Sequence, residues 1–344
     1  MSEHNNEFEF IQPNQINEEQ KASMRTRIIS AIVGIVIAVP LIVLGDFFFF
    51  AFVAFLLFAS TWEIIHCAKK KYCIALYIVA FLIAIALTYW PIIISIPDYV
   101  SGVKEFGWHI YTAFERVYIS ISMVALGAIG VFTMVLIDKG FTVRDACFIF
   151  TMMLLICVGY QSGLYLRYIP SIANNAINGG MPSSYFNMFD NLESSLLIVY
   201  VLIATFMTDA GAYFVGVFFG KHKMLERISP KKTWEGFFGG VIISSIVSFA
   251  FAFLFSMFGH PLLIGVLDFD HWYLILILSF LIPMASVLGD FVFSSAKRFF
   301  GIKDFGNLMP GHGGALDRLD SVIFTLTTTA VFISAAYYFL SLIK

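Results

Sequence analysis

The sequence predicts an all-α, polytopic membrane protein with about nine transmembrane helices, and three observations support this prediction. Hydrophobic residues make up 59% and charged residues 13% of the 344 residues, whereas charged residues are about 25% of an average soluble domain. The mean hydropathy is +0.86. Apolar runs of about 20 residues, the length that crosses a bilayer as a helix, recur along the whole chain.

The predicted elements follow from these runs in order. Residues 1–24 are polar, rich in Asn, Gln and Glu, and predict a disordered cytoplasmic tail without the layout of a signal peptide. We therefore expect the first helix to be retained. An N-terminal transmembrane region, 25–195, precedes a C-terminal region, 196–344, that carries the candidate catalytic residues. The nine spans are predicted near residues 28–45, 47–66, 73–96, 117–137, 146–168, 196–219, 235–258, 272–296 and 321–342.

Lysine and arginine residues predict the orientation, because they are enriched in cytoplasmic loops. With the N-terminus inside and the C-terminus outside, only 4 of the 21 Lys and Arg residues fall outside, which leaves 17 inside. The outside residues are Lys104, Arg116, Arg167 and Lys344. This asymmetry also assigns both polar motifs described below to the cytoplasmic side.

Several other polar residues are not assigned to a site. The polar loop from Pro170 to Ser195 receives no function. Four cysteines form no CxxC pair, lie in or beside apolar runs, and are interpreted as packing residues: Cys67, Cys73, Cys147 and Cys157. Four residues near span ends are interpreted as solvated interface residues: Glu63, His66, Glu115 and His271.

The segment from Gly289 to Asp320 concentrates charge in an otherwise apolar chain. Continuing the helix that starts near Trp272 would put four polar side chains on one face, at i, i+4, i+7 and i+8: Asp290, Ser294, Lys297 and Arg298. Asp317 and Asp320 then open the next apolar run, where a helix N-terminus exposes N–H groups. Three carboxylates so close together repel one another unless a cation or lysines intervene.

Between these helices, the glycines of the segment Pro310–Gly314 allow backbone amides to close on an anion. Carboxylates suit a divalent cation, and amides with ammonium groups suit phosphate. The combination indicates a site for a metal-bound polyphosphate.

A second polar segment begins at Asp209, roughly 18 Å of helix from Lys221 at about 1.5 Å per residue. A carboxylate at that depth is expected to face protein or a water-filled cavity. The spacing of Gly216 and Gly220 equally allows simple close packing of helices. Lys231 and Lys232 lie between Pro230 and the next helix start, where phosphates could dock, although such a charge run also fits an ordinary cytoplasmic loop.

These motifs resemble a known family. Ser294-x-x-Lys297-Arg298, Lys303-Asp304-x-Gly306 and Pro310-Gly311-His312-Gly313-Gly314-x-x-Asp317-Arg318-x-Asp320 are similar to the signature of the phosphatidate cytidylyltransferases, or CDP-diacylglycerol synthases. The segments Asp209–Gly220 and Ser229–Gly236 fit the same family, whereas the N-terminal half matches only in its hydrophobic pattern.

The resemblance implies Mg²⁺-dependent transfer of CMP from CTP to phosphatidic acid, in an integral protein of a bacterial cytoplasmic membrane whose active site faces the cytoplasm. It implies a homodimer and no nucleic-acid partner, and it leaves open whether a monovalent cation joins the Mg²⁺. The implied catalytic residues are Asp290, Lys297, Arg298, Asp317 and Arg318. The implied metal ligands are Asp290, Asp317 and Asp320. The implied substrate-binding residues are Asp209, Ser229, Lys231, Lys232, Ser294, Lys303, Asp304, Gly311, His312, Gly313 and Gly314.

Two residues depart from the family pattern. Phe293 stands where the family usually has Glu, and Val217 stands where an Arg often follows Gly216. If the family's Glu assists metal binding, its role is filled otherwise in this chain or is absent.

Two further functional classes stay open. A CTP-dependent kinase for a polyprenol-type lipid would use the same metal and phosphate groups but would have to deprotonate a hydroxyl. A transporter of anionic lipid would also need charge within the membrane, but it has no need of three carboxylates at one membrane face.

Overall fold

A computed structural model of the chain describes residues 18–100, 110–178, 188–308 and 313–343. Within these residues it contains a helix at each of the nine predicted positions, so the predicted helix placement is confirmed. The helices are α1 (Glu18–Leu44), α2 (Asp46–His66), α3 (Ile74–Val100), α4 (Ile110–Ile137), α5 (Val143–Asn178), α6 (Met188–Phe219), α7 (Trp234–Met257), α8 (Trp272–Phe299) and α9 (Leu316–Ile343).

Six helices of the described chain are long and apolar enough to cross a membrane, namely those containing the spans Phe47–His66, Val143–Ser171, Leu192–Phe219, Trp234–Met257, Trp272–Phe299 and Leu316–Leu342. The apolar stretches of α1, α3 and α4 are shorter in the described residues. Large apolar side chains such as Ile246 and Leu276 are exposed on the helix surfaces, as lipid-facing residues are. The protein is therefore helical and suited to a membrane, while nine crossings remain a prediction.

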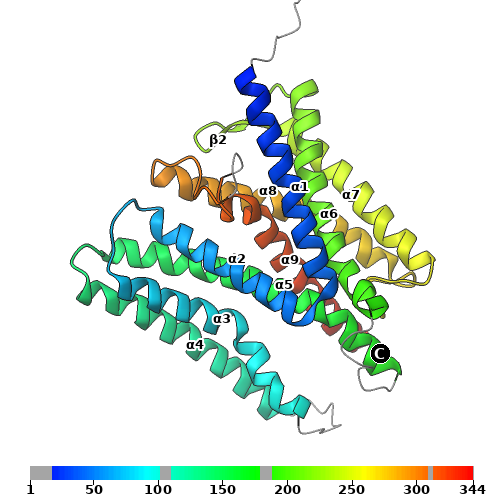
Figure 1. Cartoon of the computed structure of the whole chain (residues 1–344). Helices are drawn as coiled ribbons and strands as arrows, with labels where there is room; N and C mark the ends of the chain where they lie inside the picture. The colour runs from blue at the N-terminus through cyan, green and yellow to red at the C-terminus, as the bar shows by residue number, and fades with distance from the viewer. Residues whose placement is uncertain (1–17, 101–109, 179–187, 309–312, 344) are drawn as a thin grey trace, which may run out of the picture.

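The helices form two groups around a shared centre (Figure 1). α3 and α4 pair with each other and pack on α5, and α2 packs on α5 as well. On the other side, α6 packs extensively against α7, and α7 against α8. α9 joins the two groups because it packs against both α5 and α8.

The contact between α6 and α7 is close because small residues lie along it. A Cβ atom at Gly240 of α7 would lie 2.7 Å from the carbonyl oxygen of Thr208 on α6. Only glycine permits this approach, which is the usual basis of close helix packing in membranes. The contact fixes the position of Asp209, the residue after Thr208.

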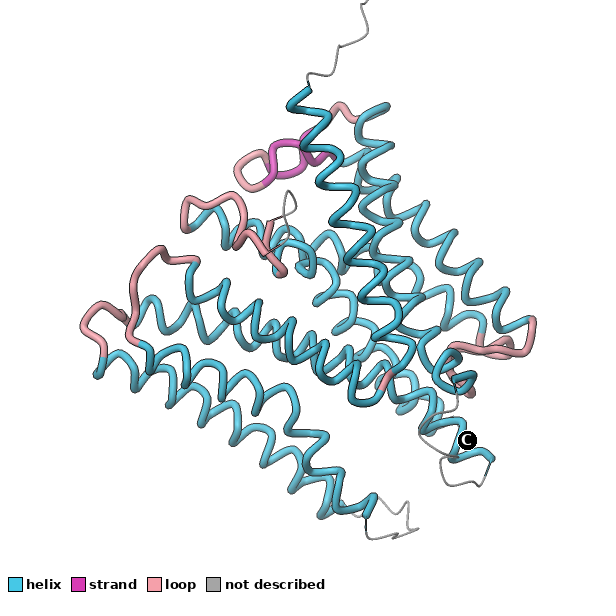
Figure 2. The backbone as a smooth tube through the Cα atoms, viewed as in Figure 1, coloured by secondary structure: helices cyan, strands magenta, loops and turns pink. Residues whose placement is uncertain are grey.

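The polar loops gather at one end of the bundle (Figure 2). The loops after α2, α4, α6 and α8 lie at this end, whereas the loop between α7 and α8 lies at the opposite end. Both polar motifs predicted from the sequence therefore belong to the same end, which we call the loop end.

A short antiparallel hairpin at the loop end was not part of the all-α prediction. β1 (Lys223–Leu225) pairs with β2 (Ser229–Thr233), with Lys223 opposite Thr233 and Leu225 opposite Ser229. The Thr233 side chain then accepts a hydrogen bond from the N–H of Gly236 and caps α7. Strands this short carry no readable alternation, so tertiary contacts rather than pattern define them.

The described cysteines are all free. Cys67 and Cys157 are buried, in agreement with a packing role, and burial raises the pKa of the Cys67 thiol to about 12. Cys147 is exposed on α5, so the packing interpretation is wrong for that residue.

Candidate active site

The site begins with an ion pair between the hairpin and α8. Lys232 of β2 forms this pair with Asp290 of α8, and its ammonium group also lies 4.6 Å from the centroid of the Phe291 ring. Ser294, one turn after Asp290, donates a 3.1 Å hydrogen bond to the Asp290 carboxylate. The predicted helical face of α8 is thus polar and directed toward the hairpin.

Two further carboxylates approach Asp290 from other helices. Asp209 of α6 lies within electrostatic range of Asp290, Lys232 and Arg318. Asp320 of α9 lies within electrostatic range of Asp290 and Asp209. Three helices, α6, α8 and α9, therefore each contribute one carboxylate to the loop end. We call Asp209, Asp290 and Asp320 the carboxylate cluster.

The members of the cluster differ in burial. Asp320 is 9% exposed and accepts a hydrogen bond from the N–H of Ser321. Asp290 is partly exposed, and Asp209 is exposed although it lies in an apolar helix. Exposure of a carboxylate within such a helix requires access to water or to a charged partner. Asp320 is thus the most shielded member of the cluster, whereas Asp209 and Asp290 keep exposed surface.

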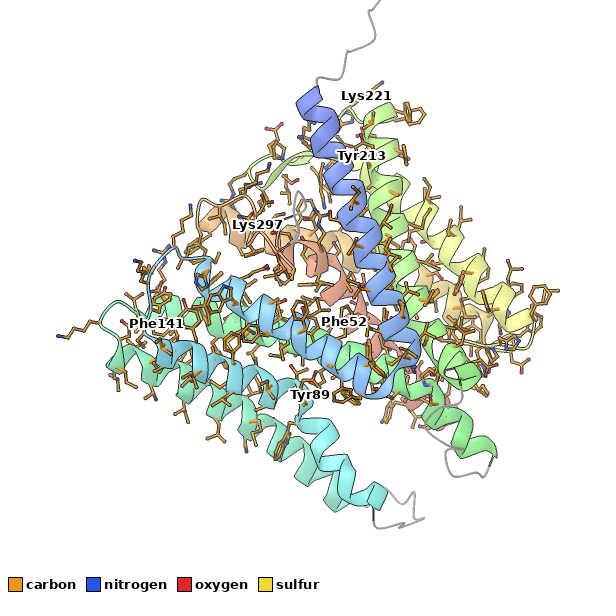
Figure 3. The ribbon with its side chains drawn as sticks, viewed as in Figure 1. Phe52, Tyr89, Phe141, Tyr213, Lys221 and Lys297 are labelled. Carbon is orange, nitrogen blue, oxygen red and sulfur yellow. The ribbon has the colours of Figure 1, made fainter. Side chains whose placement is uncertain are left out.

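Lys297 lies buried beside Asp320. Its ammonium nitrogen lies 3.0 Å from an oxygen of Asp317 and 3.9 Å from an oxygen of Asp320. The residue is only 8% exposed, and the ring of Phe305 lies 5.4 Å from the ammonium. Figure 3 shows Lys297 in the upper part of the molecule, toward Lys221 and away from Tyr89. A lysine buried in this way is held in place by its two carboxylate partners.

Asp317 is engaged by Lys297 and, unlike the members of the carboxylate cluster, also by backbone amides of the loop between α8 and α9. One oxygen faces Lys297, and the other accepts hydrogen bonds from the N–H groups of Phe305 at 2.8 Å and Gly314 at 2.9 Å. Asp317 therefore ties together both ends of the loop between α8 and α9. Among the described residues, no three His, Cys, Asp or Glu side chains are arranged to hold a metal ion. The predicted metal triad of Asp290, Asp317 and Asp320 stays a prediction.

The predicted anion-binding turn is only partly described. Pro310, Gly311 and His312 lie outside the described residues. Gly313 has a positive φ of 89°, a conformation that suits glycine. The N–H of Gly314 already donates to the Asp317 carboxylate, so this amide is engaged by the protein itself.

The remaining predicted residues lie at the loop end. Arg298 donates hydrogen bonds to the carbonyl of Ile228 in the hairpin turn at 3.2 Å and to that of Ile302 at 3.3 Å. It thereby connects the hairpin to the loop after α8. Ser229 is half-buried in β2, whereas four other predicted residues are exposed at the loop end: Lys231, Lys303, Asp304 and Arg318.

Two acidic residues at the loop end were missed from the sequence. Glu63 of α2 is 5% exposed and accepts hydrogen bonds from the start of α9, so its interpretation as a solvated interface residue is wrong. Glu235 accepts hydrogen bonds from the backbone N–H groups of Lys221 and His222 and fixes the entry to the hairpin. The available signal for Glu63 was its charge inside an apolar run.

Three other residues were also interpreted as solvated interface residues, and the described structure shows side-chain contacts for two of them. His66 and His271 make local contacts, with the Trp62 carbonyl and the Asp268 carboxylate respectively. The side chain of Glu115 lies outside the described residues.

The two departures from the family pattern lie in different environments. Phe293 is fully buried, and its ring packs edge-on against Phe305 and Phe324. It therefore supports the loop after α8 and the first half of α9 through these two rings. Val217 is 63% exposed on α6.

Comparison with known proteins agrees with the motifs. Phosphatidate cytidylyltransferase of Bacillus subtilis (strain 168) is 42% identical over 153 residues, which are 44% of this chain and 53% of the relative. The phosphatidate cytidylyltransferase of Haemophilus influenzae (strain Rd) is 41% identical over 150 residues, 44% of this chain and 48% of the relative. The chain thus spans about half the length of the curated relatives it matches. The model of the cytidylyltransferase family matches residues 25–336, and the chain therefore belongs to that family.

Proposed function

We propose that the protein transfers CMP from CTP to phosphatidic acid, giving CDP-diacylglycerol and pyrophosphate. The observation that carries this proposal is the carboxylate cluster with Lys232 and Lys297 at the loop end of apolar helices. A reaction between a water-soluble nucleotide and a membrane lipid requires such a charged site at the membrane surface. Membership of the cytidylyltransferase family and the names of the relatives support cytidylyl transfer as the reaction.

The carboxylate chemistry of the cluster suits a divalent cation, although among the described residues these side chains would have to move closer together to coordinate one. The cluster offers carboxylate oxygens, the donors that Mg²⁺ prefers, from three helices. Lys232 and Lys297 pair with Asp290 and Asp320, and Arg318 lies within electrostatic range of Asp209, so a bound cation would compete with these side chains for the carboxylates. Bound Mg²⁺ would neutralise the triphosphate and stabilise charge on the leaving pyrophosphate.

We propose that Asp290 and Asp320 hold the cation and that Asp209 or Asp317 provides the third carboxylate. Asp209 lies within electrostatic range of Asp290 and makes no hydrogen bond to the loop between α8 and α9 among those described. Asp317, the ligand expected from the motif, would first have to release Lys297 and the N–H groups of Phe305 and Gly314. The geometry therefore favours Asp209.

The chemistry requires positioning more than proton transfer. An oxygen of the phosphatidate attacks the α-phosphorus of CTP while the bond to the pyrophosphate breaks. The attacking oxygen is already anionic, so no strong general base is needed, and the main barrier is the approach of two anions. Lys232, at the partly exposed edge of the site, would orient a phosphate, while buried Lys297 keeps Asp317 and Asp320 in place.

The orientation follows the lysine and arginine asymmetry. We propose that the loop end faces the cytoplasm of a bacterial cell, where CTP is available, and that the lipid tails remain in the bilayer. The homodimer implied by the family resemblance belongs to the same proposal, and so does the absence of a nucleic-acid partner.

The direct test uses the purified full-length protein in lipid nanodiscs containing phosphatidic acid. We expect CDP-diacylglycerol to form when CTP and Mg²⁺ are present and to disappear when EDTA is added. Release of CDP with phosphorylation of an added polyprenol would instead identify the lipid kinase. Counterflow of lipid without nucleotide turnover would identify the transporter.

A further inference from the structure

Glu63 of α2 lies far in sequence from the family-signature segment, Gly289–Asp320, but contacts it in the structure. One carboxylate oxygen accepts a 2.8 Å hydrogen bond from the N–H of Ala315, 252 residues downstream, and the other accepts a 2.8 Å bond from that of Leu316. Both donors belong to the start of α9. A carboxylate is favoured at this position because the N–H groups and the dipole of the helix end both attract negative charge.

Two glycines leave the space that the Glu63 carboxylate fills. A Cβ atom at Gly306 would lie 2.6 Å from an oxygen of Glu63, and a Cβ at Gly314 would collide with the same carboxylate. Gly306 and Gly314, two glycines of the loop between α8 and α9, therefore both lie against the Glu63 carboxylate. Glu63 is 5% exposed, so neither oxygen is presented to a substrate.

Glu63 and Asp317 together occupy three consecutive amides. The N–H of Gly314 donates to Asp317, and those of Ala315 and Leu316 donate to Glu63. The start of α9 is thus engaged by two carboxylates of the protein itself. Asp320, a member of the carboxylate cluster, follows one turn later, so its position depends on how firmly this helix end is held.

We propose that Glu63 is a positioning residue of the active site, which anchors the start of α9 to α2 and thereby sets the place of Asp317 and Asp320. This inference rests on the proposed function in that the proposed function assigns Asp320 to the cation, while Asp317 holds the loop beside it. It also gives the N-terminal half, whose sequence carries no motif, a defined part in the activity.

The anchor is tested by Glu63→Ala and Glu63→Gln, with Asp268→Asn as the matched control. Asp268 also accepts hydrogen bonds from two backbone N–H groups, those of Gly265 and His271, beside the start of α8 at the opposite end of the bundle. All variants are compared with the wild type in nanodiscs by amide hydrogen exchange and by CTP-dependent kinetics.

We expect Glu63→Ala to raise exchange at Ala315 and Leu316 by about 10- to 100-fold, the scale of losing hydrogen bonds to a buried charged group. It should lower kcat by a similar factor, raise the Mg²⁺ concentration for half-maximal rate, and leave the KM for phosphatidic acid within about threefold. Glu63→Gln should be intermediate, because its amide oxygen still accepts a hydrogen bond. Asp268→Asn should leave these quantities near the wild-type values.

The outcomes separate the two proposals. If Glu63→Ala exchanges faster at the start of α9 but keeps wild-type kcat and Mg²⁺ dependence, Glu63 is merely structural and the inference fails. Unchanged exchange would also overturn it. If Glu63→Ala does not fold, Glu63→Gln provides both measurements. A folded wild type that forms no CDP-diacylglycerol overturns the proposed function and the positioning role with it, while exchange still reports on the anchor.

Discussion

Asp317 and Asp320 lie three residues apart on the first turn of α9, yet they face different surroundings. Asp317 holds the loop through Phe305 and Gly314, and Asp320 belongs to the carboxylate cluster. The sequence predicted both residues as metal ligands. It could not show that Asp317 instead binds loop amides, because no sequence pattern encodes which carboxylate those amides contact. The same limit applies to Glu63, whose partners lie 252 and 253 residues away.

The first prediction distinguishes the candidate metal ligands. Asp290→Asn and Asp320→Asn should each lower activity by at least about 10²-fold, because each removes a preorganised charge, and should raise the Mg²⁺ requirement. Asp209→Asn should raise that requirement as well, whereas Asp317→Asn should mainly increase amide exchange in the loop. Val292→Ala, at an exposed position on the side of α8 that points away from Asp290, should remain within a few-fold of wild type. If Asp317→Asn instead raises the Mg²⁺ requirement and Asp209→Asn does not, the results would support the triad expected from the motif, in which Asp317 is the third ligand.

The second prediction concerns Phe293. A glutamate there would be buried between the Phe305 and Phe324 rings, at a cost of about 3 kcal/mol or more if it stays unpaired. We therefore expect Phe293→Glu to lower the melting temperature without reducing the Mg²⁺ requirement. Phe293→Leu, which keeps the site apolar, should be far milder. A lower Mg²⁺ requirement in Phe293→Glu would show that position 293 reaches the cation.

At the scale of elements, helices were predictable and the hairpin was not. Each helix coincides with a long apolar run, so one physical signal locates it. β1 and β2 are 3 and 5 residues long and depend on contacts from Glu235 and Arg298. The hairpin nevertheless carries Lys232 to Asp290, so the candidate site depends on an element that the sequence pattern does not show.

The third prediction tests the close contact of α6 and α7. Gly240→Ala would bring a methyl group to 2.7 Å from the Thr208 carbonyl, so the helices must separate and Asp209 must move. We expect a drop in kcat of at least about tenfold, as for a misplaced site residue. Gly34→Ala is the matched control, because nothing lies within 4 Å of the added carbon in α1. Equal activity of the two variants would contradict a positioning role for this contact.

At the scale of the whole molecule, the two halves of the chain meet at the loop end. α9 packs against α5 of the N-terminal half and α8 of the C-terminal half, and Glu63 connects α2 to the signature loop. The sequence indicated a division near residue 195 because the motifs cluster after it, but helix packing crosses that boundary. Only the C-terminal half carries recognisable motifs, and both halves build the site.

The fourth prediction concerns orientation. In a cysteine-free background, Asn178→Cys should be labelled by an impermeant reagent from outside, and Lys223→Cys only from inside, because 17 of the 21 Lys and Arg residues lie in the segments assigned to the cytoplasm. Labelling is measured in intact cells and in inverted vesicles. Labelling of both cysteines from one side would contradict the nine-span arrangement.

The most direct measurement follows two radioactive labels of CTP in nanodiscs containing phosphatidic acid and Mg²⁺. If the protein transfers CMP, label on the α-phosphate appears in the lipid product, and label on the γ-phosphate leaves as pyrophosphate. Asp290→Asn is the matched control, since it removes the partner of Lys232 and should suppress both transfers. Appearance of the γ-label in lipid, with the α-label released as CDP, would contradict cytidylyl transfer and identify a CTP-dependent kinase.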